Sequence, residues 1–230
     1  MNYANDGAKY GVDQYRFAHN YDLIDQQLVI NSCDKKYTFS FTSRDKLTFD
    51  SGAGEQIFDC ECLKIEADTY FVRFGADLAV FDISQGLATL ALSGGYVFGA
   101  VEIPDRGTPD ASHHFTDEMT GTGVRWVLGC AKYTDRIYIS ADQCRAAWAP
   151  ESEVFSAYQA KYVKIKDGIY LVDVTGPVPD GACAPAGCDR IIALEDYEHM
   201  LLAGCVFSKS GAMMIGGYGE FPEFSQDLFS

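Results

Sequence analysis

The stretch LKIEADTYFVRF, residues 63–74, returns one hundred residues later as VKIKDGIYLVDV, residues 163–174. Four of the twelve positions are identical, and each stretch contains two short runs of alternating apolar and polar residues around a polar turn. Such alternation is typical of half-buried β-strands joined in a hairpin. Because the match holds without gaps over both runs, it predicts that the chain is an internal duplication of one β-domain.

A second match extends the repeat toward the end of each copy. Four residues of the first copy have identical residues in the second at a spacing of 109. They are Leu92, Gly95, Val97 and Phe98, matched by Leu201, Gly204, Val206 and Phe207. This spacing exceeds one hundred by nine, so the second copy is predicted to carry nine extra residues, supplied by the loop at 177–185.

Strand-length runs rich in β-branched and aromatic residues occupy most of the chain. In the first copy they are residues 37–41, 46–49, 57–65, 69–74, 78–83, 87–92 and 95–103. No long amphipathic helix is evident, and residues 13–19 form the best, weak candidate. About eight strands per copy predict a closed antiparallel barrel, because closure removes the exposed edges of a sheet. One larger barrel built from two halves is the alternative.

The stretch PDRGTPDASHHFTDEMTGTG, residues 104–123, is rich in turn-forming residues and has no strand periodicity. We expect it to be a linker between an N-terminal barrel at 1–103 and a C-terminal barrel at 124–230. The expected fold class is therefore all-β, with two tandem antiparallel β-barrels that arose by internal duplication.

The composition is that of a folded, acidic protein. Hydrophobic residues make up 47% of the 230 positions and aromatic residues 13%, which is enough for a packed interior. The net charge of −15 would repel nucleic acid. No run approaches the roughly 20 apolar residues of a membrane helix, and the opening MNYANDGAKYGVDQ has no signal-peptide pattern. We expect a cytoplasmic protein that binds neither nucleic acid nor membrane.

Eight cysteines and four histidines are candidate metal ligands. Cys60 and Cys62 share one face of a predicted strand, and four others stand singly among apolar residues, like small core residues: Cys33, Cys130, Cys144 and Cys205. Cys183 and Cys188, in the loop GACAPAGC, could pair or hold a metal, but reduced thiols are the favoured interpretation because metal knuckles carry a second ligand pair. His113 and His114 are adjacent in an extended segment and therefore point in opposite directions. No metal and no other cofactor are expected.

Three stretches of the second copy carry a resemblance to a known family. They are YTDRIYIS at 133–140, AKYVKIKDGIYLVDV at 160–174 and LLAGCVFSKSG at 201–211. They resemble the C-terminal domain of MoaF-type proteins, and IFDCECLKIEADTYFVRFGADLAVFDISQG at 57–86 is similar to the matching N-terminal domain. The resemblance implies a lipocalin-like, or calycin, barrel in each domain and little chemistry. Family members usually carry a tryptophan after the strand equivalent to 169–174, where this chain has Asp173 or Val174.

Strand alternation indicates which side chains line the second barrel. Tyr158, Tyr162 and Lys164 share one face of a predicted strand, and Tyr170 lies on the next strand. Tyrosine hydroxyls and a lysine inside an apolar barrel can hold the polar end of a small molecule or transfer protons, especially if burial lowers the pKa of the lysine. The alternative is that the tyrosines fill the core and the lysine lies in water at a strand end.

His199 is the histidine of greatest interest. It shares strand phase with Tyr197 and Leu201, and its counterpart in the first copy, at the spacing of 109, is Leu90. A histidine at an inner position of only one copy would be a candidate general acid or base. The alternative is a histidine at a strand end that faces solvent or makes a structural hydrogen bond.

The predicted site residues form two groups. The catalytic group is His199, Tyr162 and Lys164, and the ligand-binding group is Tyr138, Trp148, Tyr158 and Tyr170. The leading hypothesis is a cofactor-independent isomerase, cyclase or lyase that acts by proton transfer on a small, partly apolar metabolite. A non-catalytic carrier or sensor of such a ligand is the alternative, and a structural protein is the third. No GxSxG, P-loop, GxGxxG or HExxH motif argues for other chemistry. The expected partner is thus a small molecule, and a homodimer is left open.

Overall fold

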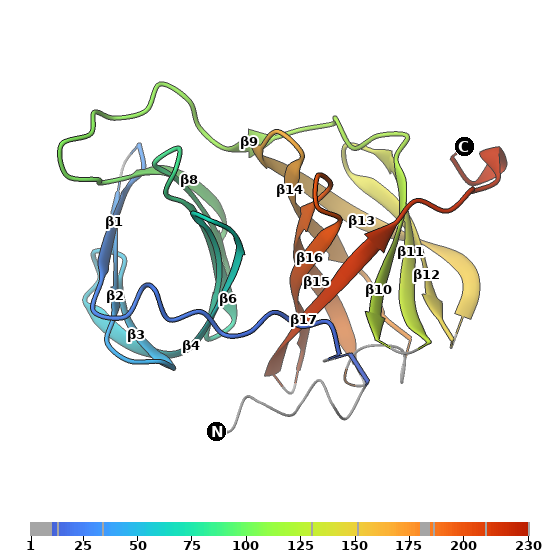
Figure 1. The fold of residues 1–230 in the computed structure, drawn as a ribbon, viewed down its shortest axis with the longest axis horizontal. Helices are drawn as coiled ribbons and strands as arrows, with labels where there is room; N and C mark the ends of the chain where they lie inside the picture. Colours follow the sequence, from blue (N-terminus) through green and yellow to red (C-terminus); the bar gives the residue numbers. More distant parts are fainter. Residues whose placement is uncertain are drawn as a thin grey trace. The chain divides into compact units, whose positions relative to one another are not determined.

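The computed structural model describes residues 11–12, 14–33, 35–129, 131–150, 152–179, 185, 187–209 and 211–229. The chain divides into two compact units, one formed by Phe17–His114 and the other by Phe115–Ser230 together with the N-terminal residues up to Arg16. Each unit contains a closed antiparallel β-barrel (Figure 1). The predicted all-β fold with two tandem barrels is confirmed. One barrel built from two halves is excluded, because each sheet closes within its own unit.

The first barrel consists of eight strands in sequential order, each antiparallel to the next. They are β1 (Gln27–Asn31), β2 (Lys36–Phe41), β3 (Lys46–Asp50), β4 (Glu55–Glu66), β5 (Thr69–Phe74), β6 (Asp77–Asp82), β7 (Leu87–Leu92) and β8 (Gly95–Val101). The barrel closes where Ile30 lies opposite Val101. Neighbouring strands can follow one another because short turns suffice to join antiparallel strands.

The second barrel repeats this order with eight strands of its own. They are β10 (Gly123–Gly129), β11 (Lys132–Ser140), β12 (Gln143–Ala149), β13 (Ser152–Lys166), β14 (Ile169–Thr175), β15 (Cys188–Asp196), β16 (Leu201–Ser208) and β17 (Gly211–Glu220). It closes where Trp126 lies opposite Gly219. The short strand β9 (His114–Phe115) adjoins β13 in the same sheet, and a 3-10 turn at Gln226–Phe229 follows β17.

A glycine permits the close approach of the two closing strands in each barrel. At Gly99 on β8 a Cβ atom would lie 2.7 Å from the carbonyl oxygen of Asn31, and at Gly217 on β17 it would lie 2.6 Å from that of Val127. A larger residue at either position would push the closing strands apart. Both barrels therefore close in the same way, as an internal duplication predicts.

The strand registers relate the two copies residue by residue. Leu87 lies opposite Asp82 in the first barrel, and Leu201 lies opposite Asp196 in the second. Equivalent residues are thus 100 apart on β4 and β5, 114 apart on β6 and β7 and 118 apart on β8, so the connection from β14 to β15 holds fourteen extra residues. The predicted nine-residue insertion and the match at 109 are wrong, since Leu201 corresponds to Leu87 and not to Leu92.

A short segment before the first strand lies across one end of each barrel. We call residues 20–26 the first cap and residues 116–122 the second cap. Leu23 of the first cap and Met119 of the second are buried in the core of their own barrel. The sequence predicts a linker at 104–123. In the structure the chain belongs to the second unit from Phe115 onward, so the linker ends earlier than predicted.

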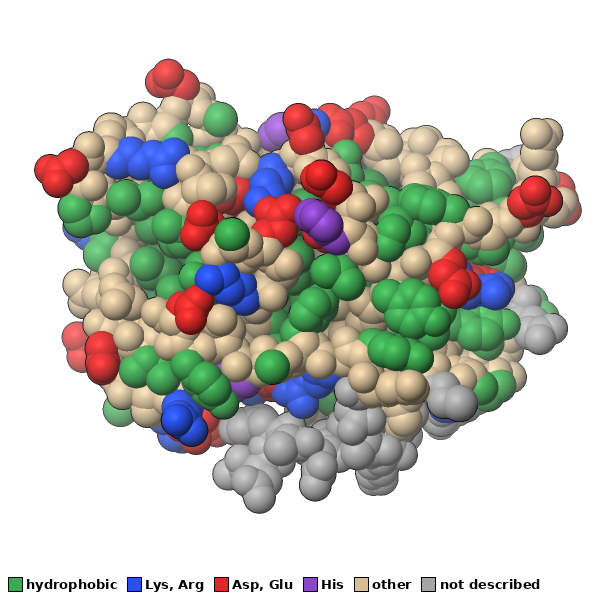
Figure 2. Space-filling view, in the orientation of Figure 1, with side chains coloured by type: hydrophobic (Ala, Val, Ile, Leu, Met, Phe, Trp, Pro, Cys, Tyr) green, Lys and Arg blue, Asp and Glu red, His purple; other side chains and the backbone are tan. Residues whose placement is uncertain are grey.

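The described cysteines bear out their interpretation as core residues only in part. Of the cysteines interpreted as single core residues, Cys144 and Cys205 are buried and Cys33 is exposed. Cys60, Cys62 and Cys188 are also buried, and Cys130 and Cys183 lie outside the described residues. Acidic side chains are spread over the face drawn in Figure 2, with lysine and arginine among them. No helix in the described part of the chain is long and apolar enough to cross a membrane.

Candidate functional site

Four polar side chains form one connected group in the interior of the second barrel. Arg136 and Tyr138 lie on β11, Glu195 lies on β15, and Tyr197 lies in the turn that follows. Glu195 Oε1 accepts a hydrogen bond from Arg136 Nη1 at 2.5 Å, and Oε2 accepts hydrogen bonds from the Tyr138 hydroxyl at 2.6 Å and the Tyr197 hydroxyl at 2.9 Å. Arg136, Tyr138 and Glu195 are fully buried. The group is an ion pair whose carboxylate is also held by two phenols.

Burial and charge act in opposite directions on the pKa values of this group. Burial raises the pKa of Glu195, although the charge of Arg136 and the two phenol hydrogen bonds oppose the rise. Burial also raises the pKa of Tyr138 and Tyr197 well above the ordinary value. Burial alone would lower the pKa of Arg136, but the negative charge of Glu195 raises it. Arg136 is therefore a buried cation, and Glu195 is a buried carboxyl on whose pKa burial and the neighbouring groups act in opposite directions.

The first barrel holds aromatic side chains at the equivalent places. Arg136, Tyr138 and Glu195 correspond by register to Phe39, Phe41 and Phe81. The rings of Phe39 and Phe81 pack edge to face with their centroids 5.2 Å apart. The barrel fold therefore does not require the polar group, and a buried ion pair is often less stabilising than apolar side chains of similar volume. Polar groups kept at such a place are typical of a functional site.

One edge of the Arg136 guanidinium has no hydrogen-bond partner within the described residues. Nη1 binds Glu195, whereas Nε and Nη2 are buried without an acceptor. Thr134 Oγ1, two residues earlier on the same face of β11, is also buried and without a partner among these residues. Trp148 lies opposite Thr134 in the strand register, and its ring lies 5.9 Å from Arg136 Cζ. Buried donors without acceptors are rare in native proteins, so this edge indicates a place for a bound molecule or ordered water.

The structure brings the predicted ligand-binding aromatic residues, and Tyr162, into one core. They are Tyr138, Trp148, Tyr158 and Tyr162, which are buried, and Tyr170, which packs against them partly buried. Trp148 Nε1 donates to the Tyr158 hydroxyl at 3.1 Å, and that hydroxyl donates to the carbonyl of Pro177 at 3.1 Å. The Tyr162 hydroxyl donates to the carbonyl of Gln143 at 2.8 Å, and burial raises the pKa of Tyr162. The proton of Tyr162 is therefore held firmly by the protein.

Lys164 lies at the capped end of the second barrel. Its Nζ is 2.9 Å from Glu118 Oε1 and 2.9 Å from Asp167 Oδ1, and the Tyr170 hydroxyl donates to Glu118 Oε2 at 2.9 Å. These two carboxylates raise the pKa of Lys164. A catalytic role for this lysine depended on a lowered pKa, and the structure gives the opposite direction, because carboxylates accept hydrogen bonds from its ammonium group.

The first barrel has an equivalent arrangement. Lys64 Nζ is 2.6 Å from Asp22 Oδ2 of the first cap and lies 5.1 Å from the centre of the Tyr70 ring. Both barrels thus hold their cap with a lysine and a carboxylate, whereas the first barrel has Phe39 and Phe81 where the second has Arg136 and Glu195. We therefore interpret the arrangement around Lys164 as a structural latch of the cap.

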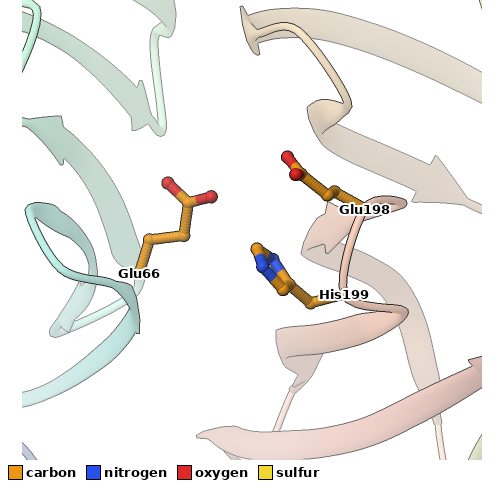
Figure 3. A group of neighbouring side chains, drawn as sticks. All are labelled: Glu66, Glu198 and His199. Carbon is orange, nitrogen blue, oxygen red and sulfur yellow. The ribbon is translucent and has the colours of Figure 1, made fainter.

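His199 lies in the turn between β15 and β16 (Figure 3). Asp196, fully buried at the end of β15, accepts hydrogen bonds from the backbone N–H groups of Glu198 and His199 and lies 2.8 Å from His199 Nδ1. The His199 side chain is 54% exposed. The predicted inner position of His199 is wrong, because the turn ends the strand alternation after Asp196. Its counterpart in the first barrel is Gln85, whose N–H group binds Asp82 in the same way.

Two further features lie outside the barrel interior. A cavity of about 310 Å³ on the outside of β10–β12 is lined in part by Arg125, Tyr133 and Asp135. Asp135 binds both Nε and Nη2 of Arg125, at 2.6 and 2.8 Å, so the charge of this arginine is already paired. Glu66, which Figure 3 also labels, is the last residue of β4 in the first unit.

Sequence reasoning missed Arg136 and Glu195. The signal that would have found them is a charged residue at a place where the other copy has phenylalanine. That signal appears only when β11 is aligned with β2 at a spacing of 97 residues and β15 with β6 at a spacing of 114. The strand registers require both spacings. The identical residues used for the alignment gave spacings of 100 and 109 instead.

Comparison of the chain with models of known protein families and with curated proteins gave no match. The resemblance to MoaF-type proteins therefore stays a prediction. The barrel in each domain that it implies is present in the structure.

Proposed function

We propose that the second barrel binds a small, partly apolar molecule in its interior, and that Arg136 and Glu195 hold the polar end of that molecule. The observation that carries the proposal is the unpartnered edge of a fully buried guanidinium. Trp148, Tyr158 and Tyr162 supply the aromatic surroundings that such a ligand needs. The first barrel, with phenylalanine at the equivalent places, has no comparable anchor for a polar group.

A carrier or sensor is the role that this geometry favours. The three residues predicted to be catalytic are not assembled for proton transfer: His199 lies in an exposed turn, Lys164 is an ion-paired ammonium, and the Tyr162 hydroxyl is bonded to a backbone carbonyl. A general acid or base must reach the reacting group with a pKa near the working pH. Binding through Arg136 requires none of these conditions.

A proton-transfer enzyme is the second candidate, and one observation favours it. Burial raises the pKa of Glu195, and the carboxyl is hydrogen-bonded to Tyr138 and Tyr197. A buried carboxyl with a raised pKa can act as a general acid or base toward a ligand held beside it. In this reading Glu195 moves the proton and Arg136 stabilises charge that develops on the substrate.

Native mass spectrometry of the full chain, purified without denaturation, tests the binding role. We expect a small molecule to be retained by the wild type and lost when Arg136→Phe and Glu195→Phe are combined, because the double variant has the apolar pair of the first barrel. Arg125→Met, on the neighbouring strand but outside the barrel, is the control and should retain the molecule. If the retained molecule is recovered unchanged after incubation at high dilution, the protein is a carrier or sensor. If the molecule is converted during the incubation, the protein is an enzyme. Retention by the double variant would contradict the proposed site.

A further inference from the structure

The chain itself shows how its arginines bind carboxylates. Arg125 Nε and Nη2 donate to the two carboxylate oxygens of Asp135 at 2.6 and 2.8 Å. Arg190 Nε and Nη2 donate to those of Asp173 at 2.9 and 2.8 Å. Arg136 binds Glu195 through Nη1 instead, and its Nε and Nη2 are buried and have no acceptor among the described residues. Arg125 and Arg190 thus bind a carboxylate through Nε and Nη2, and on the buried Arg136 this edge is open.

We propose that this edge of Arg136 binds the carboxylate of a small carboxylic acid, whose two oxygens accept hydrogen bonds from Nε and Nη2. Two parallel N–H groups match a carboxylate better than a single carbonyl oxygen, because each oxygen receives its own charge-assisted hydrogen bond. The unpartnered hydroxyl of Thr134, on the same face of β11, is a further donor. The inference rests on the proposed binding function and adds the class of ligand.

Two side chains near Arg136 are shorter than their counterparts in the first barrel. Ala146, directly opposite Arg136 in the register, corresponds to Phe49, and Val174 corresponds to Phe74. In the first barrel both of these phenylalanines pack against the residue that Arg136 replaces. We expect an aromatic or aliphatic ligand body to take the places of these two rings beside Arg136. The neighbouring Trp148 ring offers such a body an apolar surface.

Charge balance links the binding of an acid to Glu195. Arg136 already neutralises Glu195, so a second carboxylate would leave one uncompensated negative charge in the interior. The groups that face Glu195 are Trp126 on β10, Arg136 and Tyr138 on β11, Cys144 on β12, Tyr162 on β13 and Tyr197 in the turn, and Arg136 is the only cation among them. Uptake of one proton by Glu195 restores neutrality. Binding of the acid is therefore coupled to proton uptake, and affinity falls as pH rises.

Calorimetric titration of the full chain with benzoate, phenylacetate and octanoate tests this inference, with the three corresponding amides as neutral controls of the same shape. We expect at least one acid to bind about tenfold or more tightly than its amide, because the charge-assisted pair is lost in the amide. Titration in buffers of different ionisation enthalpy should show uptake of about one proton per acid bound. Arg136→Lys keeps the positive charge but loses the two parallel N–H donors, and it should weaken binding of the acid about tenfold or more. Arg125→Met should bind like the wild type.

Each other outcome has a defined meaning. If Arg136→Lys fails to fold, the double variant Arg136→Phe with Glu195→Phe takes its place and must lose binding. Amides that bind as tightly as acids, or loss of binding in Arg125→Met, would overturn the carboxylate site. A neutral molecule retained in native mass spectrometry would overturn the ligand class but leave the proposed function standing. If neither acids nor amides bind and no molecule is retained, the edge of Arg136 meets ordered water only, and both proposals fail.

Discussion

A buried guanidinium and a buried carboxylate attract each other strongly, but each gives up its hydration when the chain folds. In the first barrel Phe39 and Phe81 fill the equivalent places without giving up the hydration of a charge. The two barrels share strand order, closure and register, so they are a matched comparison within one chain. This comparison supports our proposal that Arg136 and Glu195 are kept for what they bind and not for the stability they add.

Combining Arg136→Phe with Glu195→Phe tests this interpretation through stability. We expect the double variant to be as stable as the wild type or more stable by up to about 4 kcal/mol, because an apolar pair replaces a desolvated ion pair. Arg136→Phe alone should lose about 3–5 kcal/mol, because it leaves the buried carboxyl of Glu195 without its cation. Urea unfolding of the three proteins measures both effects. A double variant less stable than the wild type would show that the fold itself needs the ion pair.

The reactivity of the cysteines tests whether the barrel interiors stay closed. Burial raises the pKa of Cys60 to about 11 and that of Cys144 to about 12, from an ordinary value of 9.0. Two pKa units lower the fraction of reactive thiolate about a hundredfold. We therefore expect iodoacetamide at pH 8 to modify the exposed Cys33 long before Cys60 or Cys144, as mapped by peptide mass spectrometry. Equally fast modification of Cys60 or Cys144 in the native protein would mean that its barrel opens readily.

At the level of elements, the caps are a part of the duplication that sequence comparison could not find. The first cap reads NYDLIDQ and the second reads TDEMTGT, without one identical residue in register. What they share is physical: an acidic residue, Asp22 or Glu118, followed directly by a long apolar residue that is buried in the barrel. Because neither cap is a strand, neither shows the alternation on which the sequence analysis relied. The second cap was therefore taken as the end of a linker.

Glu118→Gln should loosen the second cap, because the neutral amide no longer pairs with the ammonium group of Lys164. We expect faster hydrogen exchange of the backbone amides of residues 116–122, and in particular of Gly121, which donates to the carbonyl of Tyr138 at 2.8 Å. Asp117→Asn removes the same charge from the neighbouring exposed residue and is the control. Equal acceleration in both variants would show that the total charge of the cap, and not the latch, controls its exchange.

At the level of the whole molecule, the sequence predicted the fold but not the centre of the site. Strand alternation and the repeat at a spacing of 100 were sufficient for two all-β barrels, since both depend on local pattern. The correspondence after the insertion was not recoverable from a few identical residues, because strands of similar composition match at many spacings. The spacing of 109 differs from the true 114 by an odd number, which exchanges inner and outer faces. For this reason Leu90, an inner residue, was matched with His199 in a turn, and Glu195 was overlooked.

The N-terminal segment gives the last prediction, because it belongs to the second barrel although the first barrel follows it in sequence. Val12 is fully buried in the second core, and a Cβ atom at Gly129 on β10 would lie 1.8 Å from the carbonyl oxygen of Gly11, so the segment packs tightly there. Val12→Ala should destabilise the second barrel by roughly 2 kcal/mol through lost apolar burial. The chain has two tryptophans, Trp126 and Trp148, and both lie in this barrel. Tryptophan fluorescence therefore reports its unfolding, while far-ultraviolet circular dichroism follows both barrels. We expect Val12→Ala to shift the fluorescence transition in urea to lower concentration and to leave the remaining dichroism transition in place; an equal shift of both would show that the two units unfold as one.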